Sequence, residues 1–246
     1  MHIKIASHEV ELPELSQTLR DALPVVAFCA LNENINAFSD EAAAIGGDPH
    51  LTDAGKSAKT APLAERLIDR IMVAVENIEH DRAHWDKRES ALLDVGAPSS
   101  ANEAARDAEI RAWWRSAPVE ERQRIMREVE AAPEHAELVR ALLRSPVPDA
   151  LDLEKRHFRL LHDQIRRIEN PGEAVAIETG RTAVDWAERA MGHAVGIAFN
   201  LMNRKPEDIA KHAVAGGHET AAQKLFGAHA VARAKAAIAA EQRQVA

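Results

Sequence analysis

The sequence predicts an all-α protein, a multi-helix bundle with two long helices and a C-terminal helical tail. Alanine is abundant, aromatic residues make up only 4% of the chain and tyrosine is absent, which favours helices over a β-sandwich or barrel. Apolar residues recur at spacings of three and four through most of the chain, the period of an amphipathic helix. Proline and glycine stand mainly between these segments, where they begin or end helices.

The N-terminal part predicts a short arm followed by a bent helix. In residues 1–12, apolar and charged side chains alternate briefly, which leaves two interpretations open: an extended arm that pairs with a neighbouring subunit, or a frayed terminus. We expect a helix over residues 13–45 with a bend at Pro24, ended by Gly46 and Gly47. Its apolar stripe contains Phe28, Leu31, Ile35, Phe38, Ala42 and Ile45.

Residues 60–94 predict the first long helix, preceded by a turn in which Thr52 caps a helix. Its buried stripe contains Leu63, Leu67, Ile71, Val75, Ile78 and Trp85. The C-terminal end is rich in charge, which is typical either of a solvated end or of a segment that packs against a partner. Glu76, His80 and His84 have the spacing of metal ligands on one helix face, but no further ligand is nearby, so we interpret them as solvated polar residues.

Residues 99–148 predict three short helices with clear boundary signals. Ser100 and Glu103 have the spacing of a capping box, and Pro118 and Pro133 stand where a first helical turn tolerates proline. Pro146 and Pro148 end the run. The large anchors are Trp113 and Trp114, and the apolar faces contain Ile125, Met126, Val129, Leu138, Val139, Leu142 and Leu143. The mixed charges of this segment are typical of an internally paired surface.

Two further helices are expected over residues 150–169 and 173–203, joined by a turn at residues 170–172. The first carries an apolar stripe, Phe158, Leu161, Ile165 and Ile168. It also holds the most basic patch of the chain, a candidate for contact with nucleic acid or an acidic partner: Arg156, His157, Arg159, His162, Arg166 and Arg167. The second is the other long helix, with Val184, Ala187, Met191, Val195, Phe199 and Met202 on one side.

Glycine and tryptophan in the second long helix suggest helix contacts. Because glycine inside a helix costs roughly 1 kcal/mol relative to alanine, we expect a close helix–helix approach at Gly192 and Gly196, within the chain or between subunits. Trp186 lies off the main stripe, so it is either exposed or fills a partner's pocket.

The C-terminal region predicts a helix that begins at Pro206 and ends at Gly216 and Gly217, followed by an alanine-rich helical tail. The apolar residues of the tail, including Leu225 and Phe226, are too sparse for a self-sufficient helix. We therefore expect the tail to dock on another surface or to become ordered in an assembly.

Composition and motifs argue against several functions. The formal net charge of −8 is unlike the basic footprint of a general nucleic-acid binder. A single cysteine, Cys29, is typical of a protein in a reducing compartment. Because Cys29 lies in an apolar run, we interpret it as a small core residue. The AGKS stretch is not a phosphate-binding loop, because His50 occupies the position where that motif requires glycine. With neither a signal peptide nor a membrane-spanning run evident, we expect a cytosolic chain that does not associate with membranes, unless it is packaged. We assign no catalytic, cofactor-binding or metal-binding residue.

Two stretches resemble helical proteins encoded in tailed-phage genomes. EIRAWWRSAPVEERQRIMREVEAAPEHAELVRALLRSP, residues 109–146, is similar to a segment with an E-I-R opening, an S-x-P-x-E-R middle and an L-x-x-A-L-L-x-x-P close. DPHLTDAGKSAK, residues 48–59, resembles the D-P-x-L-T-x-x-G-K entry to the preceding long helix in those proteins. The two stretches together make up about a fifth of the chain, 50 of its 246 residues.

The resemblance implies a structural virion protein rather than an enzyme, with a head–tail connector (adaptor) as the leading hypothesis. Copies would form a homo-oligomeric ring that binds the portal and tail proteins and lets DNA pass without sequence-specific binding; the acidic balance would repel phosphates from the lumen. It would be made in the host cytoplasm and reside in the virion. A phage scaffolding or internal ejection protein, and a cytosolic helical enzyme or regulatory binding module, remain alternatives.

We expect three consecutive regions, 1–98, 99–148 and 149–246, with the C-terminal tail (residues 218–246) as the portal-docking element. The predicted interface residues are Trp113, Trp114, Trp186, Gly192, Gly196, Leu225 and Phe226.

Overall fold

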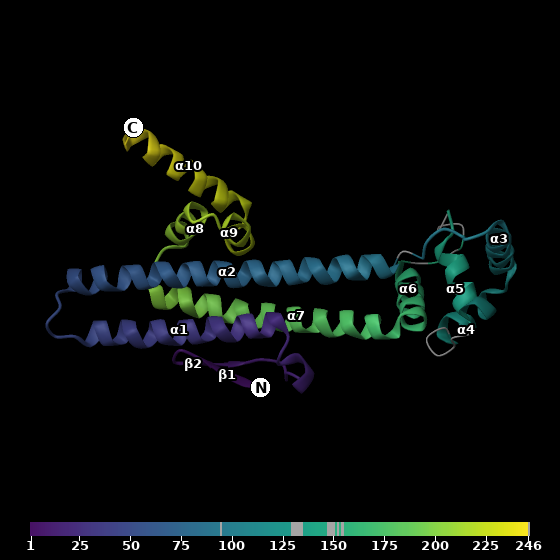
Figure 1. Cartoon of the computed structure of the whole chain (residues 1–246), viewed down its shortest axis with the longest axis horizontal. Coiled ribbons are helices and arrows are strands. Elements are labelled where there is room, and N and C mark those ends of the chain that lie inside the picture. The colour runs from purple at the N-terminus through teal and green to yellow at the C-terminus, as the bar shows by residue number, and fades with distance from the viewer. Residues whose placement is uncertain (94, 129–134, 147–150, 152, 154, 246) are drawn as a thin grey trace. The chain divides into compact units, whose positions relative to one another are not determined.

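The computed structural model of the protein describes residues 1–93, 95–128, 135–146, 151, 153 and 155–245 (Figure 1). It is predominantly helical, as predicted. The chain forms two compact units, one of residues 1–84 and 180–246 and the other of residues 85–179. The first unit thus joins the two ends of the chain, whereas the sequence suggests three consecutive regions. The sequence does not indicate that the two ends belong to one unit, because the contacts between them join segments about a hundred or more residues apart.

The centre of the first unit is a layer of three long helical segments. These are α1 (Leu23–Gly47), the first part of α2 (Asp53–Leu93) and the second part of α7 (Pro171–Met202), which run alongside one another in Figure 1. Their predicted apolar stripes are buried between them because each stripe occupies one face of its helix. The fully or nearly buried members include Phe28, Leu31, Ile35, Leu67, Ile71, Ile78, Val184, Ala187 and Met191.

The N-terminal arm is a β-hairpin, which neither interpretation of residues 1–12 anticipated. Strand β1 (His2–Ile5) pairs antiparallel with β2 (His8–Glu11), with Ile5 opposite His8. Ala6 in the two-residue turn adopts φ 52°, a conformation that asparagine or glycine usually supplies in hairpins. Its backbone N–H donates a 2.5 Å hydrogen bond to Asn36 Oδ1 of α1, so a tertiary contact supports the turn.

Pro24 begins a helix instead of bending one. A short 3-10 helix, Gln17–Leu19, precedes α1, and Pro24 lies in the first turn of α1, where its missing N–H costs no helical hydrogen bond. The second helix also begins earlier than the predicted residue 60. Thr52 Oγ1 accepts a 3.1 Å hydrogen bond from Gly55 N, confirming the predicted cap, and Pro62 is accommodated inside α2.

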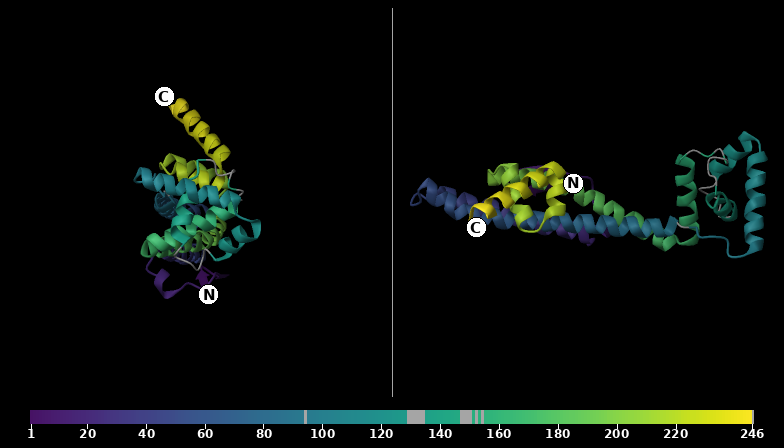
Figure 2. Two further views of the ribbon diagram at one scale, coloured as in Figure 1. Left: turned by 90° about the vertical axis from the view of Figure 1, so that its right-hand side faces the viewer. Right: turned by 90° about the horizontal axis from the view of Figure 1, so that it is seen from above.

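The C-terminal region forms three helices: α8 (Pro206–Ala215), α9 (Glu219–Phe226) and α10 (Ala228–Val245). The predicted end of α8 at Gly216 and Gly217 is confirmed. Gly227, with φ 83° and ψ 161°, separates α9 from α10. In Figure 1 these helices and the N-terminal hairpin lie on opposite sides of the three-helix layer, and Figure 2 gives two further views.

The expected turn at residues 170–172 is instead the start of α7, because Pro171 serves as its first residue.

The second unit contains α3 (Ala101–Ser116), α4 (Val119–Glu128), α5 (Ala136–Leu143) and α6 (Lys155–Glu169). Its core confirms the predicted apolar faces and consists of Trp114, Ile125, Val139, Leu142, Leu151, Leu161 and Ile165, with Met126, Leu138 and Leu143 packed against it. The predictions for Val129, Pro133 and Pro148 concern positions outside the described residues.

Polar contacts fix the entry to α3. Ser100 Oγ accepts a 3.2 Å hydrogen bond from Glu103 N, which confirms the capping spacing, and Glu103 in turn accepts 2.6 Å bonds from the backbone N–H and hydroxyl of Ser99. The guanidinium of Arg144 joins Glu103 at 2.6 Å, the buried Asp107 at 3.3 Å and the carbonyl of Gly96 at 2.9 Å. Arg144 therefore ties the end of α5 to α3 and to the chain that precedes it.

Candidate functional site

The two adjacent tryptophans of α3 have opposite environments. The Trp114 side chain is 1% exposed, and its indole N–H donates a 3.1 Å hydrogen bond to the Leu151 carbonyl. Trp114 is therefore a core residue of its own unit, which corrects its assignment as an interface candidate. Trp113 is 46% exposed and remains a candidate for contact with a partner.

Trp186 also belongs to the interior, contrary to both interpretations of its position. The side chain is 5% exposed and packs edge-to-face against Phe28 of α1, with ring centroids 5.4 Å apart. The indole N–H donates a 3.0 Å hydrogen bond to the Pro13 carbonyl. Trp186 lies outside the main apolar stripe because α7 is buried along a second edge as well. This edge faces α1 and the segment that precedes α1.

Gly192 and Gly196 lie on an exposed face of α7. A methyl group added at either position would meet no atom of the described residues within 4 Å, so the predicted close helix approach does not occur there among the helices that the structure describes. Contact between subunits at these glycines stays a prediction. Small residues do line the buried side of α7, but they are alanines: Ala183, Ala187, Ala190, Ala194 and Ala198.

The C-terminal segment docks on its own chain through a row of polar pairs. Four acidic residues on α2, which we call the acidic row, are Glu65, Asp69, Glu76 and Glu79. Their partners follow in the same order along the chain: Arg204 at 3.5 Å, His212 at 2.9 Å, His218 at 3.1 Å and Lys224 at 2.8 Å. The spacing of the row, 4, 11 and 14 residues after Glu65, keeps all four carboxylates on one side of α2.

Apolar contacts accompany this row. Phe226 stacks on Phe199 of α7 with ring centroids 5.5 Å apart, and Ile209, Ala210 and Ala213 of α8 are buried. Leu225 is half-buried and lines a cavity of about 240 Å³ between α2, α7 and α9. The prediction that the tail docks is confirmed, and the surface it occupies belongs to the same chain. Leu225 and Phe226 therefore already have intramolecular contacts.

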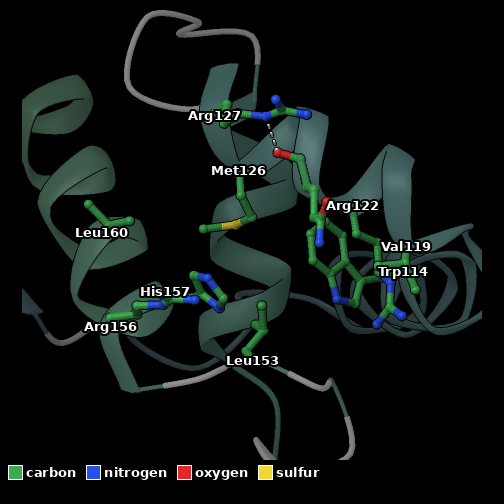
Figure 3. A pocket seen from close by; sticks show the side chains of 10 residues that line it. Trp114, Val119, Arg122, Met126, Arg127, Leu153, Arg156, His157 and Leu160 are labelled. Atoms are coloured by element: carbon green, nitrogen blue, oxygen red, sulfur yellow. Dashed lines mark hydrogen bonds between the residues drawn. The ribbon is translucent and has the colours of Figure 1, made fainter.

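A larger groove, of about 620 Å³, lies in the second unit between α4 and α6, which we call the α4–α6 groove (Figure 3). Figure 3 shows Met126 of α4 and Leu160 of α6 directed toward one another, with His157 below them. Its apolar lining is Trp114, Val119, Met126, Leu153 and Leu160. Its basic lining is Arg122, Arg127, Arg156 and His157. The groove therefore combines apolar walls with basic side chains.

The basic patch predicted on residues 150–169 contributes only partly to this groove. Arg156 and His157 line it, whereas Arg159 and Arg167 are exposed and do not line it. The side chain of Arg166 lies outside the described residues. Burial lowers the pKa of His162, which favours its neutral form. Arg122 and Arg127 of α4 were missed as site residues because, in the sequence, they belong to a run of mixed charges.

The residues considered as metal ligands or as a nucleophile do not form a reactive site. Glu76 pairs with His218, and His80 and His84 are exposed; across the described part of the chain, no three histidine, cysteine or acidic side chains gather as metal ligands do. Cys29 is exposed on α1, which corrects its assignment to the core. Its thiol pKa is raised by partial burial and by Glu33, opposite to the shift of a reactive nucleophile.

Within the described residues, none of the helices combines the length and hydropathy that crossing a bilayer requires. A comparison of the chain with protein-family models, curated proteins and solved structures yielded no match.

Proposed function

We propose that the protein is a structural component of a tailed-phage virion, a head–tail connector whose copies form a ring between the portal and the tail. The resemblance of residues 48–59 and 109–146 to phage helical proteins motivates the class. The helical architecture suits a mechanical role, in which rigid helices form the walls of a ring. The net charge of −8 would let DNA pass through the lumen without adhering to it.

One observation carries the proposal: besides the single exposed residues Met1, Val73 and Val175, two pairs of large apolar side chains that are close in sequence are exposed. Leu23 and Val26, one turn apart on α1, are 73% and 48% exposed, and Trp113 and Val119, across the α3–α4 turn, are 46% and 51% exposed. A closed ring requires two different, complementary surfaces on each subunit, because each copy contacts one neighbour with one surface and the other neighbour with the second. Exposed clusters of large apolar residues are typical of such contact surfaces.

The docking of the C-terminal segment on its own chain narrows the proposed portal-binding element to a shorter stretch of residues. Residues 218–227 help to attach this segment to α2 and α7, so their removal would disturb the subunit itself. Helix α10, residues 228–245, follows that attachment; Val231 and Ala234 are buried, and most of its other described residues are exposed. We therefore assign portal docking to α10, and a truncation after Gly227 separates this role from folding better than removal of residues 218–246.

The experiment is native mass spectrometry of the purified chain, with and without portal rings, for the wild type and two double variants. Leu23→Lys with Val26→Lys removes one surface, and Trp113→Lys with Val119→Lys removes the other. The proposal predicts a cyclic oligomer that both variants abolish, while circular dichroism keeps its helical signal. Val73→Lys is the matched control, because Val73 is also an exposed apolar residue, on α2. A monomer that does not bind portal rings in any variant would contradict the proposal.

A further inference from the structure

The N-terminal hairpin leaves one of its two edges open. In an antiparallel pair, residues alternate between bonding the opposite strand and directing their backbone groups outward. Leu12 N donates a 2.8 Å hydrogen bond to the Met1 carbonyl, so this pair bonds across the hairpin. Glu11 and Glu9 lie an odd number of positions before Leu12, so they direct their backbone N–H and C=O groups away from β1. These groups form the outer edge of β2.

The other edge of the hairpin, along β1, is used within the chain. The hairpin lies beside α1 (Figure 1), and the outward carbonyl of Lys4 accepts a 3.2 Å hydrogen bond from Asn32 Nδ2 of that helix. On the β2 edge, no hydrogen bond within the described residues reaches the backbone groups of Glu9 or Glu11. Such an edge is a template for a further strand. A two-stranded sheet also gains stability when a third strand is added.

The two faces of the hairpin indicate the pattern of the strand that would fit. On the inner face, Val10 and Leu12 of the second half are buried, as is Ile5 of β1. On the outer face, Glu9 and Glu11 are exposed. Residues directly opposite one another in neighbouring strands share a face. An added strand would therefore place apolar side chains beside the inner face and its intervening side chains beside the two glutamates, where lysine or arginine is stabilising.

The charge of this edge is available to a partner. Glu11 is exposed and has no ion pair within the described residues. The Glu9 side chain is 75% exposed, has one 3.8 Å contact with His2, and stands opposite Lys4 of β1. The edge thus offers the charge of Glu11 in full and that of Glu9 in part.

Pairing of β2 with β2 of a second copy is disfavoured. Such a pair would place glutamate against glutamate, because Glu9 and Glu11 are the residues of β2 that direct backbone groups outward. Like charges directly opposite one another destabilise a sheet, and charged side chains on an edge strand are a common means of preventing self-pairing. The edge therefore favours a positively charged strand of another protein.

We propose that the outer edge of β2 pairs antiparallel with an extended segment of a protein partner, in which lysine or arginine alternates with apolar residues. The backbone groups of Glu9 and Glu11 bond the segment, and their carboxylates hold its cations. The apolar residues of the segment extend the face that Val10 and Leu12 begin. This edge uses different residues from α10 and from the exposed apolar pairs, so the inference holds whether or not the protein is a connector.

The test uses the full-length chain and fluorescein-labelled peptides of about seven residues, a usual strand length. The first peptide alternates lysine with valine, and its twin alternates glutamate with valine. Fluorescence anisotropy should give an affinity for the lysine peptide at least about tenfold higher than for its twin. N-methylation at the lysines should abolish binding, because these residues lie opposite the glutamates of β2 and direct their N–H groups toward them. N-methylation at the valines leaves those donors intact and should preserve binding.

Variants of the protein connect binding to this edge. Glu11→Pro removes an outward N–H that bonds no group within the described chain, so the hairpin should remain while the lysine peptide binds at least about tenfold more weakly. Glu11→Gln keeps the N–H and removes only the charge, so it should weaken binding about threefold. Glu9→Lys with Glu11→Lys should reverse the preference in favour of the glutamate twin. Glu41→Lys, the same charge reversal at an exposed position of α1, is the matched control and should leave affinity unchanged.

Three results would overturn the proposal. One is failure of the lysine peptide to bind more tightly than its glutamate twin. Another is equal binding of the two N-methylated peptides, which would exclude strand pairing. The third is a dimer of the wild-type chain, detected by analytical ultracentrifugation, that Glu11→Pro dissociates, because it would assign the edge to a second copy of the chain.

Discussion

The indole N–H of Trp186 donates a 3.0 Å hydrogen bond to the carbonyl of Pro13, 173 residues earlier in the chain. This bond attaches the segment after the N-terminal hairpin to α7, and the Trp186 ring packs on Phe28 of α1. One side chain thus holds three separate stretches of the first unit together. Trp186 is buried within its own chain, so we expect any contact with another copy of the chain to involve other side chains.

Trp186 variants should separate the contribution of the ring from that of the hydrogen bond. Trp186→Phe keeps an aromatic ring but removes the N–H donor, and we expect a loss of about 1–2 kcal/mol in the free energy of unfolding. Trp186→Ala should cost about 3–5 kcal/mol because it also leaves a cavity. Urea denaturation followed by circular dichroism measures both. Trp113→Phe, at an exposed position, should change stability by less than about 0.5 kcal/mol; similar losses at both tryptophans would contradict this account.

Glu103 should remain ionised in acid. Hydrogen bonds from Ser99 and the Arg144 guanidinium lower the pKa of Glu103 from 4.5 to about 2. Because the pKa is lower in the folded than in the unfolded state, ionised Glu103 favours folding above pH 4.5, and this contribution disappears as the pH falls from 4.5 through 2. Titration of the side-chain carboxyl carbon by NMR measures the pKa. Ser99→Ala should raise it toward 4.5 and Arg20→Ala should not; an unchanged pKa in Ser99→Ala would refute the assignment.

Apolar burial should contribute more than ion pairs to docking of the C-terminal segment. Ile209 is fully buried, and Ile209→Ala should cost about 2–5 kcal/mol. The ion pairs of Lys224 are partly exposed, so Lys224→Met should cost no more than about 1 kcal/mol, even though the hydrogen bond to Glu79 raises the Lys224 pKa. Hydrogen exchange of α9 and α10 amides reports the local opening. Faster exchange in Lys224→Met than in Ile209→Ala would reverse this ranking.

Replacing two glycines by alanine should change the free energy of unfolding in opposite directions. Gly192→Ala should stabilise the isolated chain by about 0.5–1 kcal/mol, because the added methyl meets no atom within 4 Å and alanine is the better helix former. Gly227→Ala should destabilise it by about 1–3 kcal/mol, because φ 83° with ψ 161° is a region used almost exclusively by glycine. Thermal unfolding of the two variants measures both effects, and a shift of the same sign in each would be contrary to expectation.

Periodicity predicted most helices because each apolar stripe is a local property of its segment. The stripes of α2, α4, α5 and α7 became buried as expected. The hairpin was missed because its turn uses Ala6 and depends on Asn36, a residue thirty positions away. Cys29 was wrongly assigned to the core for a related reason, because a local apolar run does not reveal which side of the helix packs inward.

The candidate surfaces were less predictable than the helices. The α4–α6 groove combines Trp114, Arg127 and Leu160 from three helices, and only their packing brings them together. The acidic row was equally hidden, since Glu65 and Glu79 meet Arg204 and Lys224, which lie far along the chain. Spacing along α2 places the four carboxylates on one side, but nothing local identifies the segment that they bind.

The most direct test of the connector proposal is quantitative peptide mass spectrometry of purified, DNA-filled particles from the source of the chain, with the portal protein as internal standard. The proposal predicts a copy number close to that of the portal. Presence in immature heads but not in mature particles would instead identify a scaffolding protein. Absence from both would contradict a virion role altogether.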